Sequence, residues 1–172
     1  MKQICAVVLC VMSSAVFAQA KPTVPTRDVA QIEAVVEAFR TAIIDKDKER
    51  FVRLFVPGHV TWQSVRGDDT LRIAREKNPQ AAKVTIDPNK THLTFIDGIV
   101  AAKERQEERF RNVKIETDGD IASVTSDYSF HELERETNRG QEAWHLVRTE
   151  DGWKIVSVIW SVNRTSVPRQ AN

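Results

Sequence analysis

The chain contains little cysteine and no excess of charge of either sign. Cys5 and Cys10 are the two cysteines among its 172 residues, and both lie near the N-terminus. The 25 lysine and arginine residues nearly balance the 24 aspartate and glutamate residues. A balanced chain has no bulk attraction to nucleic acid or to an anionic membrane. We therefore expect neither as a partner.

The first 20 residues are typical of a secretory signal peptide. Lys2 precedes an apolar run over 4–12, and small residues follow, with cleavage sites that end at Ala18 and Ala20. The run is too short to span a bilayer as a helix, and no cationic flank favours the alternative of an uncleaved membrane anchor. We expect a periplasmic or secreted protein. Cleavage would remove both cysteines, so the mature chain would have no disulfide and no thiol nucleophile.

The chain also lacks the short motifs of the common catalytic and binding sites. No HExxH, GxSxG, P-loop, EF-hand or dinucleotide-binding spacing occurs. The four histidines are scattered along the chain, and no thiolate ligand would remain after cleavage. We therefore expect no metal site and no cofactor.

The residues after the signal peptide predict one domain. A linker with two prolines covers 21–27, the domain covers 28–164 and a tail covers 165–172. Apolar residues at helical spacing predict helices in the N-terminal half, and alternation predicts strands in the C-terminal half. The first expected elements are a helix over 28–45 capped by Asp28, a short helix capped by Asp47 and ended by Pro57, a hairpin of strands over 60–65 and 70–74, and a helix capped by Thr91. Strands over 109–116, 121–132, 141–148 and 153–160 are expected to follow, with a charged loop over 134–139.

The last expected strand has an unusual pattern. A strand with one solvated face alternates apolar and polar residues, whereas this strand is apolar on both faces. If the alternation is regular, Ser157 lies alone among apolar side chains. The two expected faces carry Ile155, Ser157, Ile159 and Ser161 on one side and Val156, Val158 and Trp160 on the other.

Three segments resemble a known superfamily in the same order along the chain. They are the first helix pair around 45–55, the strand segment 120–131 and the segment 146–156 around Asp151-Gly152-Trp153. The chain from 28 to 162 resembles the nuclear transport factor 2-like, or SnoaL-like, superfamily. It is most similar to the secreted bacterial branch, whose members are labelled lumazine-binding-like or SnoaL-like proteins of unknown function. We find no residue that would recognise a pteridine, and we do not predict that ligand.

The resemblance implies a fold and an assembly. The fold is α+β, with the order α-α-β-β-α-β-β-β-β, and a curved antiparallel sheet wraps around three helices to form a cone with a pocket at its open end. One face of the sheet would cover the helices, and the other would pack against a second subunit. We therefore predict a homodimer; the alternative is that the tail or a loop covers the outer face. The predicted interface residues are Val156, Val158 and Trp160.

Polar side chains that point into the cone are the candidates for chemistry. Tyr128 shares a strand face with apolar residues, so it is expected to point inward. There its hydroxyl would contact a ligand or, alternatively, a backbone partner in the core. Asp127, Ser129 and His131 are expected on the opposite, solvated face. His145 alternates with Trp144, which suits the core, and this favours an outward His145.

Two functions of different classes remain open, because this fold supports many activities. The first is binding of a small, mostly apolar molecule. The second is a cofactor-free isomerase, dehydratase or hydrolase in which Tyr128 stabilises charge and His145 or Asp127 moves a proton. A third possibility is an accessory domain with a collapsed pocket. The expected ligand-binding residues are Phe55, Trp62, Phe95, Tyr128, Trp144 and His145.

One departure from the relatives favours binding. Many SnoaL-like chains carry histidine on the last strand, and the matching positions here are Ser157 and Ile159, which do not titrate. A carboxylate or imidazole that faces into the cone near Tyr128 would favour the enzyme instead.

Overall fold

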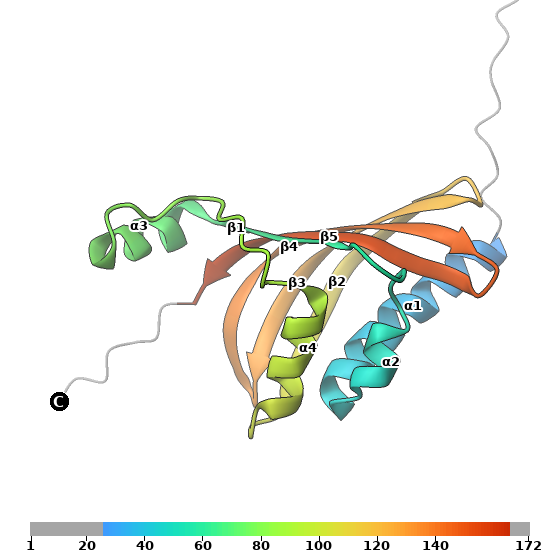
Figure 1. Cartoon of the computed structure of the whole chain (residues 1–172), viewed down its shortest axis with the longest axis horizontal. Helices are drawn as coiled ribbons and strands as arrows, with labels where there is room; N and C mark the ends of the chain where they lie inside the picture. The colour runs from blue at the N-terminus through green and yellow to red at the C-terminus, as the bar shows by residue number, and fades with distance from the viewer. Residues whose placement is uncertain (1–25, 166–172) are drawn as a thin grey trace, which may run out of the picture.

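A computed structural model describes residues 26–165 as a curved five-stranded sheet with helices packed beneath it (Figure 1). This is the α+β class that the sequence predicts. The predicted signal peptide, most of the linker and all but the first residue of the tail lie outside the described residues. The elements are α1 (Thr26–Asp45), α2 (Lys48–Val52), β1 (Thr61–Arg66), α3 (Asp68–Lys77), α4 (His92–Ala101), β2 (Gln106–Thr117), β3 (Ile121–Glu132), β4 (Arg135–Thr149) and β5 (Gly152–Arg164).

The sheet has the strand order β1-β5-β4-β3-β2. Strands β2 to β5 form an antiparallel meander, and β1 pairs with β5 in parallel. Tight turns join the meander, and Gly119 and Gly152 adopt the positive φ values that such turns require (102° and 95°). Helices α1, α2 and α4 lie under the sheet, whereas α3 lies apart at the end of β1 (Figure 1).

The predicted strand over 70–74 is wrong, because this segment lies in α3. Asp68 and Asp69 occupy the first turn of that helix and basic residues its last turn, so the charges complement the helix dipole. Leu71 is the large apolar residue that the helix buries. Because this segment has few apolar residues, their spacing does not distinguish the alternation of a strand from the period of a helix. The predicted loop over 134–139 is also wrong, since β4 begins at Arg135.

Asp28 does not cap the first helix, which begins at Thr26. Its carboxylate is buried and accepts a hydrogen bond from Arg148 Nη1 at 2.7 Å, so it joins α1 to β4. The other two predicted caps are confirmed. Asp47 Oδ1 accepts a hydrogen bond from the Arg50 amide at 2.9 Å, and Thr91 forms a capping box with Thr94.

A β-bulge at Val156 explains the apolar pattern of the last strand. Leu146 pairs with Ile155 but His145 pairs with Ser157, so Val156 is the extra residue. A bulge reverses the alternation of faces. Ile155 and Val158 therefore both face the helices, and both are 0% exposed.

The bulge corrects the predicted dimer interface. Val158 is in the core, and Trp160 packs against Trp62 of β1 with ring centroids 5.0 Å apart. Neither side chain belongs to the outer face. The apolar residue that β5 does expose there is Ile159, which is 40% exposed.

The core is an aromatic cluster between the sheet and the two N-terminal helices. Phe39 of α1 lies 4.8 Å from Phe51 of α2 and 4.7 Å from Trp144 of β4, measured between ring centroids. Phe51 in turn lies 5.1 Å from Phe55. Tilted aromatic pairs at these distances add to the free energy of area burial.

Gly140 of β4 should not tolerate a methyl group. An added Cβ would lie 2.0 Å from the backbone oxygen of Ser161 on β5. We expect Gly140→Ala to lower the free energy of unfolding in urea by about 1–3 kcal/mol or more. Gly98→Ala on α4, where a Cβ meets nothing within 4 Å, should instead raise it by about 1 kcal/mol. Equal effects of the two substitutions would contradict the close approach of β4 and β5.

Candidate active site

A cavity of about 400 Å³ lies between the inner face of the sheet and α4. Five aromatic side chains line it, and every strand of the sheet contributes to its walls. Three carboxyl side chains also line it: the buried Glu108 on β2 and Glu142 on β4, and the partly exposed Glu132 at the end of β3. The other lining residues are Trp62, Ser64, Phe95, Tyr128, Phe130, Thr137, Asn138, Trp160, Val162 and Arg164.

Glu108 and Glu142 form a hydrogen-bonded pair of buried carboxyl groups. They are 4% and 5% exposed, and they come from the strands on either side of β3. Glu142 lies opposite Ser126 of β3, whose small side chain leaves room on the inner face. A hydrogen bond between two carboxyl groups requires that one of them be protonated. The pair therefore holds one acid and one carboxylate that can exchange a proton.

The two carboxyl groups differ in proton affinity. Burial raises the pKa of Glu142 to about 7, against the opposing effect of hydrogen bonds from Trp144 and Glu108. Trp144 Nε1 donates to Glu142 Oε2 at 2.6 Å. Burial and the negative charge of Glu142 raise the pKa of Glu108 well above its usual range. Because the hydrogen bond from Trp144 Nε1 stabilises its charged form, Glu142 is the member of the pair that ionises first.

Tyr128 points inward, as predicted, and its hydroxyl already has partners within the protein. The hydroxyl oxygen lies 2.9 Å from Asn138 Oδ1 and 2.9 Å from the backbone oxygen of Ser161. Its one proton is donated to these acceptors, so Tyr128 joins β3 to β4 and β5. Burial, with the nearby Glu108 and Glu142 charges, raises the pKa of Tyr128. The hydroxyl therefore stays protonated and does not serve as a base.

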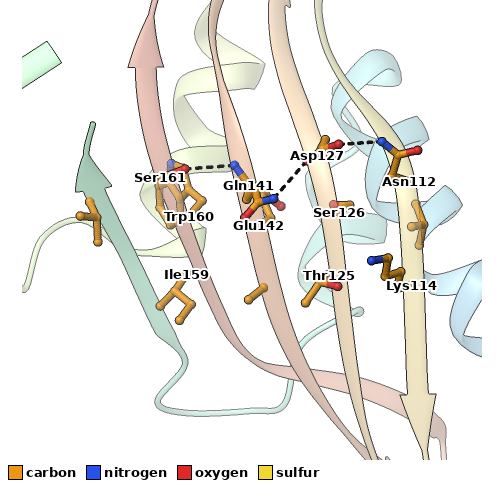
Figure 2. Close-up of a pocket in the computed structure, with 13 residues that line it drawn as sticks. Asn112, Lys114, Thr125, Ser126, Asp127, Gln141, Glu142, Ile159, Trp160 and Ser161 are labelled. Atoms are coloured by element: carbon orange, nitrogen blue, oxygen red, sulfur yellow. Dashed lines mark hydrogen bonds between the residues drawn. The ribbon is translucent and has the colours of Figure 1, made fainter. Parts of the chain in front are cut away.

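The structure does not bring Asp127 or His145 to Tyr128. His145 is exposed on the outer face of the sheet, and Asp127 lies on that face too (Figure 2). Hydrogen bonds from Asn112 and Gln141, at 2.7 and 3.4 Å, lower the pKa of Asp127. Neither residue can exchange a proton with a molecule inside the cavity, because the sheet separates them from it.

The prediction that Ser129 and His131 lie on a solvated face is wrong. Both are buried, and His131 Nε2 lies 3.0 Å from Ser129 Oγ. Their partners across the ladder are Arg109 and Glu107, which form an ion pair at 3.1 Å. Long, paired side chains beside a short one reduce its exposure. This part of the outer face is therefore covered by its own charged residues.

Of the residues predicted to bind a ligand, Trp62, Phe95 and Tyr128 line the cavity. Phe55 and Trp144 belong to the core, and Trp144 acts indirectly through its hydrogen bond to Glu142. Glu108 and Glu142 were missed by the sequence analysis. A signal was present, because Glu142 alternates in phase with Trp144 and Leu146.

A second, wider hollow of about 850 Å³ lies on the outer face of the sheet. Asn112, Asp127, Gln141 and Ser161 are joined there across four strands by hydrogen bonds (Figure 2). Ile159 and Thr125 lie below them in the same view. Lys114 lies at the same level as these two residues, so the lower end of the hollow carries apolar and charged side chains together (Figure 2).

Within residues 26–165 there is no group of three or more histidine, cysteine, aspartate or glutamate side chains that could hold a metal ion. In the same range no helix is both long enough and apolar enough to cross a membrane.

No family model and no curated protein matches the chain. Solved structures do. A Streptomyces avermitilis protein described as a "putative dehydratase from the NTF2-like family" is 20% identical with a TM-score of 0.55, and the match covers 83% of this chain and 100% of that one. An NTF2-like protein of unknown function from Pseudomonas putida is 10% identical with a TM-score of 0.59, and the match covers 86% and 95%. This chain has the nuclear transport factor 2-like fold.

A third match supports the same fold. A Nostoc punctiforme protein of unknown function with a cystatin-like fold is 13% identical with a TM-score of 0.56, and the match covers 84% of this chain and 96% of that one. At such identities the likeness extends to the nuclear transport factor 2-like fold alone.

The buried acid pair should make stability fall as the pH rises. Both carboxyl groups have a higher pKa in the folded protein, so the folded state binds more protons between about pH 4.5, the ordinary value, and about pH 7. The free energy of unfolding should decrease across this window, by up to about 1.4 kcal/mol per pH unit for each carboxyl group. Urea unfolding at several pH values measures this slope.

The double variant Glu108→Gln/Glu142→Gln should flatten the slope relative to the wild type. Asp127→Asn is the matched control, because the lowered pKa of Asp127 confines its effect to more acidic pH. A slope that survives in the double variant would mean that other groups cause it.

Proposed function

We propose that the protein is a cofactor-independent enzyme that transfers protons on a small, largely apolar carbonyl compound, in the manner of an isomerase or a dehydratase. The observation that carries the proposal is the hydrogen-bonded Glu108–Glu142 pair in an aromatic-walled cavity. A carboxylate shielded from water is a stronger base than an exposed one, and an adjacent protonated acid can stabilise developing negative charge. Binding alone would not need this pair.

In the proposed reaction Glu142 removes a proton from the carbon next to the substrate carbonyl. The electron pair of the broken C–H bond moves to the carbonyl oxygen. Glu108, whose proton had been hydrogen-bonded to Glu142, now donates it to that oxygen. In an isomerase, Glu142 then returns the proton to another carbon. In a dehydratase, the protonated Glu142 instead gives that proton to a hydroxyl group on the next carbon, whose C–O bond breaks as the C=C bond forms, and water leaves. The hydrogen bond from Trp144 Nε1 holds the Glu142 carboxylate in place throughout.

Binding without turnover is the second candidate. The aromatic rings of Trp62, Phe95 and Trp160 line the cavity, and such rings hold apolar molecules by area burial and stacking. The dehydratase description of the Streptomyces avermitilis protein agrees with the first candidate in reaction class. That protein is 20% identical to this chain, so the agreement adds little weight.

Proton abstraction can be tested with 2-indanone, an apolar aromatic ketone. The exchange of its α-protons into D₂O, followed by NMR, should be faster with the protein than in buffer. The rate should rise as the pH passes about 7, because Glu142 must be ionised to act as a base. Glu142→Gln should lower the rate by about 100-fold or more, and Glu108→Gln by a smaller factor.

Asp127→Asn is the control for that experiment, since it removes a carboxylate from the same sheet but from its outer face. It should leave the exchange rate within about twofold. Saturable binding of 2-indanone without exchange above the buffer rate would favour the binding protein. Equal losses in Asp127→Asn and Glu142→Gln would reject the assignment of the base.

We also propose that the protein acts as a homodimer in the periplasm or outside the cell, after cleavage of the predicted signal peptide. The outer face exposes Ile159 and Val113, each 40% exposed, beside a broad hollow. An apolar surface of this kind on an antiparallel sheet is a common subunit interface.

The dimer can be tested by light scattering coupled to size-exclusion chromatography. Ile159→Asp should shift the mass from dimer to monomer, because it would bury a carboxylate in the interface. Ile73→Asp on α3 is a matched control with the same 40% exposure, and it should leave the dimer intact. A monomeric wild type would reject the proposal.

A further inference from the structure

A further hollow, of about 370 Å³, adjoins the cavity that holds the acid pair. We call it the basic groove. Its far wall is formed by the segment 78–91 between α3 and α4. The groove and the cavity are neighbours and share six lining residues: Trp62, Ser64, Phe95, Trp160, Val162 and Arg164.

The basic groove carries more positive than negative charge. Arg66, Lys83, Lys90 and Arg164 line it, with Asp87 as the one acidic lining residue. Lys83 is neutralised by Asp68 at 2.6 Å. The charges of the other three cations are not offset by an ion pair within residues 26–165, since Arg66 donates to the hydroxyl of Thr85 and to a backbone carbonyl.

The segment that forms the far wall is fixed to β1. The Arg66 amide donates to the Lys83 carbonyl at 2.9 Å, and Val65 and Val84 form a β-bridge. The Arg164 amide donates to Thr70 Oγ1 at 3.0 Å, which fixes the end of β5 beside α3. The backbone on both sides of the groove is therefore fixed, which limits the loss of chain entropy when a ligand binds.

Arg164 lies where the two spaces meet. It lines both the basic groove and the cavity with Glu108 and Glu142. The rings of Trp62 and Phe95, 5.3 Å apart, form a continuous apolar wall from one space to the other. A molecule with an apolar body and one anionic end would match this arrangement, since each part would meet a surface of its own chemistry.

We propose that the basic groove binds the anionic end of the substrate, between Arg66, Lys90 and Arg164, while the apolar body lies in the aromatic cavity. The substrate class is then an amphiphilic organic anion, such as a keto or hydroxy acid. This inference rests on the proposed function for the position of the reacting carbon, but the preference for an anion is a property of binding alone.

A matched pair of fluorescent probes tests the preference without a known substrate. 8-Anilinonaphthalene-1-sulfonate has an aromatic body and a sulfonate, and N-phenyl-1-naphthylamine has the same body without the charge. In fluorescence titrations the sulfonate should bind at least about tenfold more tightly. Arg164→Gln and Lys90→Gln should each weaken sulfonate binding by about threefold to tenfold. Binding of the neutral probe should stay the same in both variants.

Lys114→Gln is the control, because it removes one positive charge from the hollow on the outer face. It should leave the binding of both probes unchanged. Two results would overturn the proposal: equal affinity of the two probes for the wild type, or a loss of sulfonate binding in Lys114→Gln that Arg164→Gln does not show. Thermal unfolding of each variant verifies that it is folded.

The failures of the two proposals are distinguishable. Exchange of 2-indanone that requires Glu142, together with no preference for the sulfonate, would reject the anion site and leave the enzyme intact. A clear preference for the sulfonate without any exchange would reject the enzyme and keep an anion-binding cavity.

Discussion

The β-bulge at Val156 is the constraint on which the inner face of this protein depends. Without it, Ile155 and Val158 would lie on opposite faces of β5. With it, Ile155 and Val158 are both buried in the core, and Trp160 reaches Trp62 at the wall of the cavity. The inserted residue thus lets side chains of β5 reach both the aromatic core and the wall of the cavity on the same face of the sheet. It also leaves Ile159 as the apolar residue that β5 presents to the outside.

The acid pair is placed where its burial can be tolerated. Two carboxyl groups in an apolar space destabilise the folded protein unless they are protonated or hydrogen-bonded. Here they bond to each other, and Trp144 supplies a further donor from the core. Trp144 also packs against Phe39 in the aromatic core, so the donor that holds the Glu142 carboxylate is itself fixed by that core.

Much of the fold follows from local pattern, and most of the site does not. The ends of β3 and the caps Asp47 and Thr91 could be predicted, because each depends on residues a few positions apart. The bulge could not, since it depends on which residue of β4 faces which residue of β5. Helix α3 was missed because its single buried large apolar residue, Leu71, leaves no period to recognise.

The acid pair shows why the site was harder still. Glu108 and Glu142 are 34 positions apart, and only the pairing of β2, β3 and β4 brings them together. Strand alternation could have placed Glu142 on the same face as Trp144, but it gives no reason to expect a second carboxyl group there. The sequence does predict the aromatic walls, because Trp62 and Phe95 are apolar in any environment. The prediction that Tyr128 points inward is also confirmed, since most side chains on the same face of its strand are apolar.

Asp127 and Glu142 show that environment, and not residue type, separates the chemistry of the two faces. They lie one strand apart on the same sheet. Asp127, on the outer face, has a lowered pKa because Asn112 and Gln141 donate hydrogen bonds to its charged form. Glu142, on the inner face, has a raised pKa because burial penalises the charged form more than Trp144 and Glu108 stabilise it. A carboxylate that stays ionised is a weak base, so of these two side chains Glu142 is the one whose proton affinity suits a general base near neutral pH.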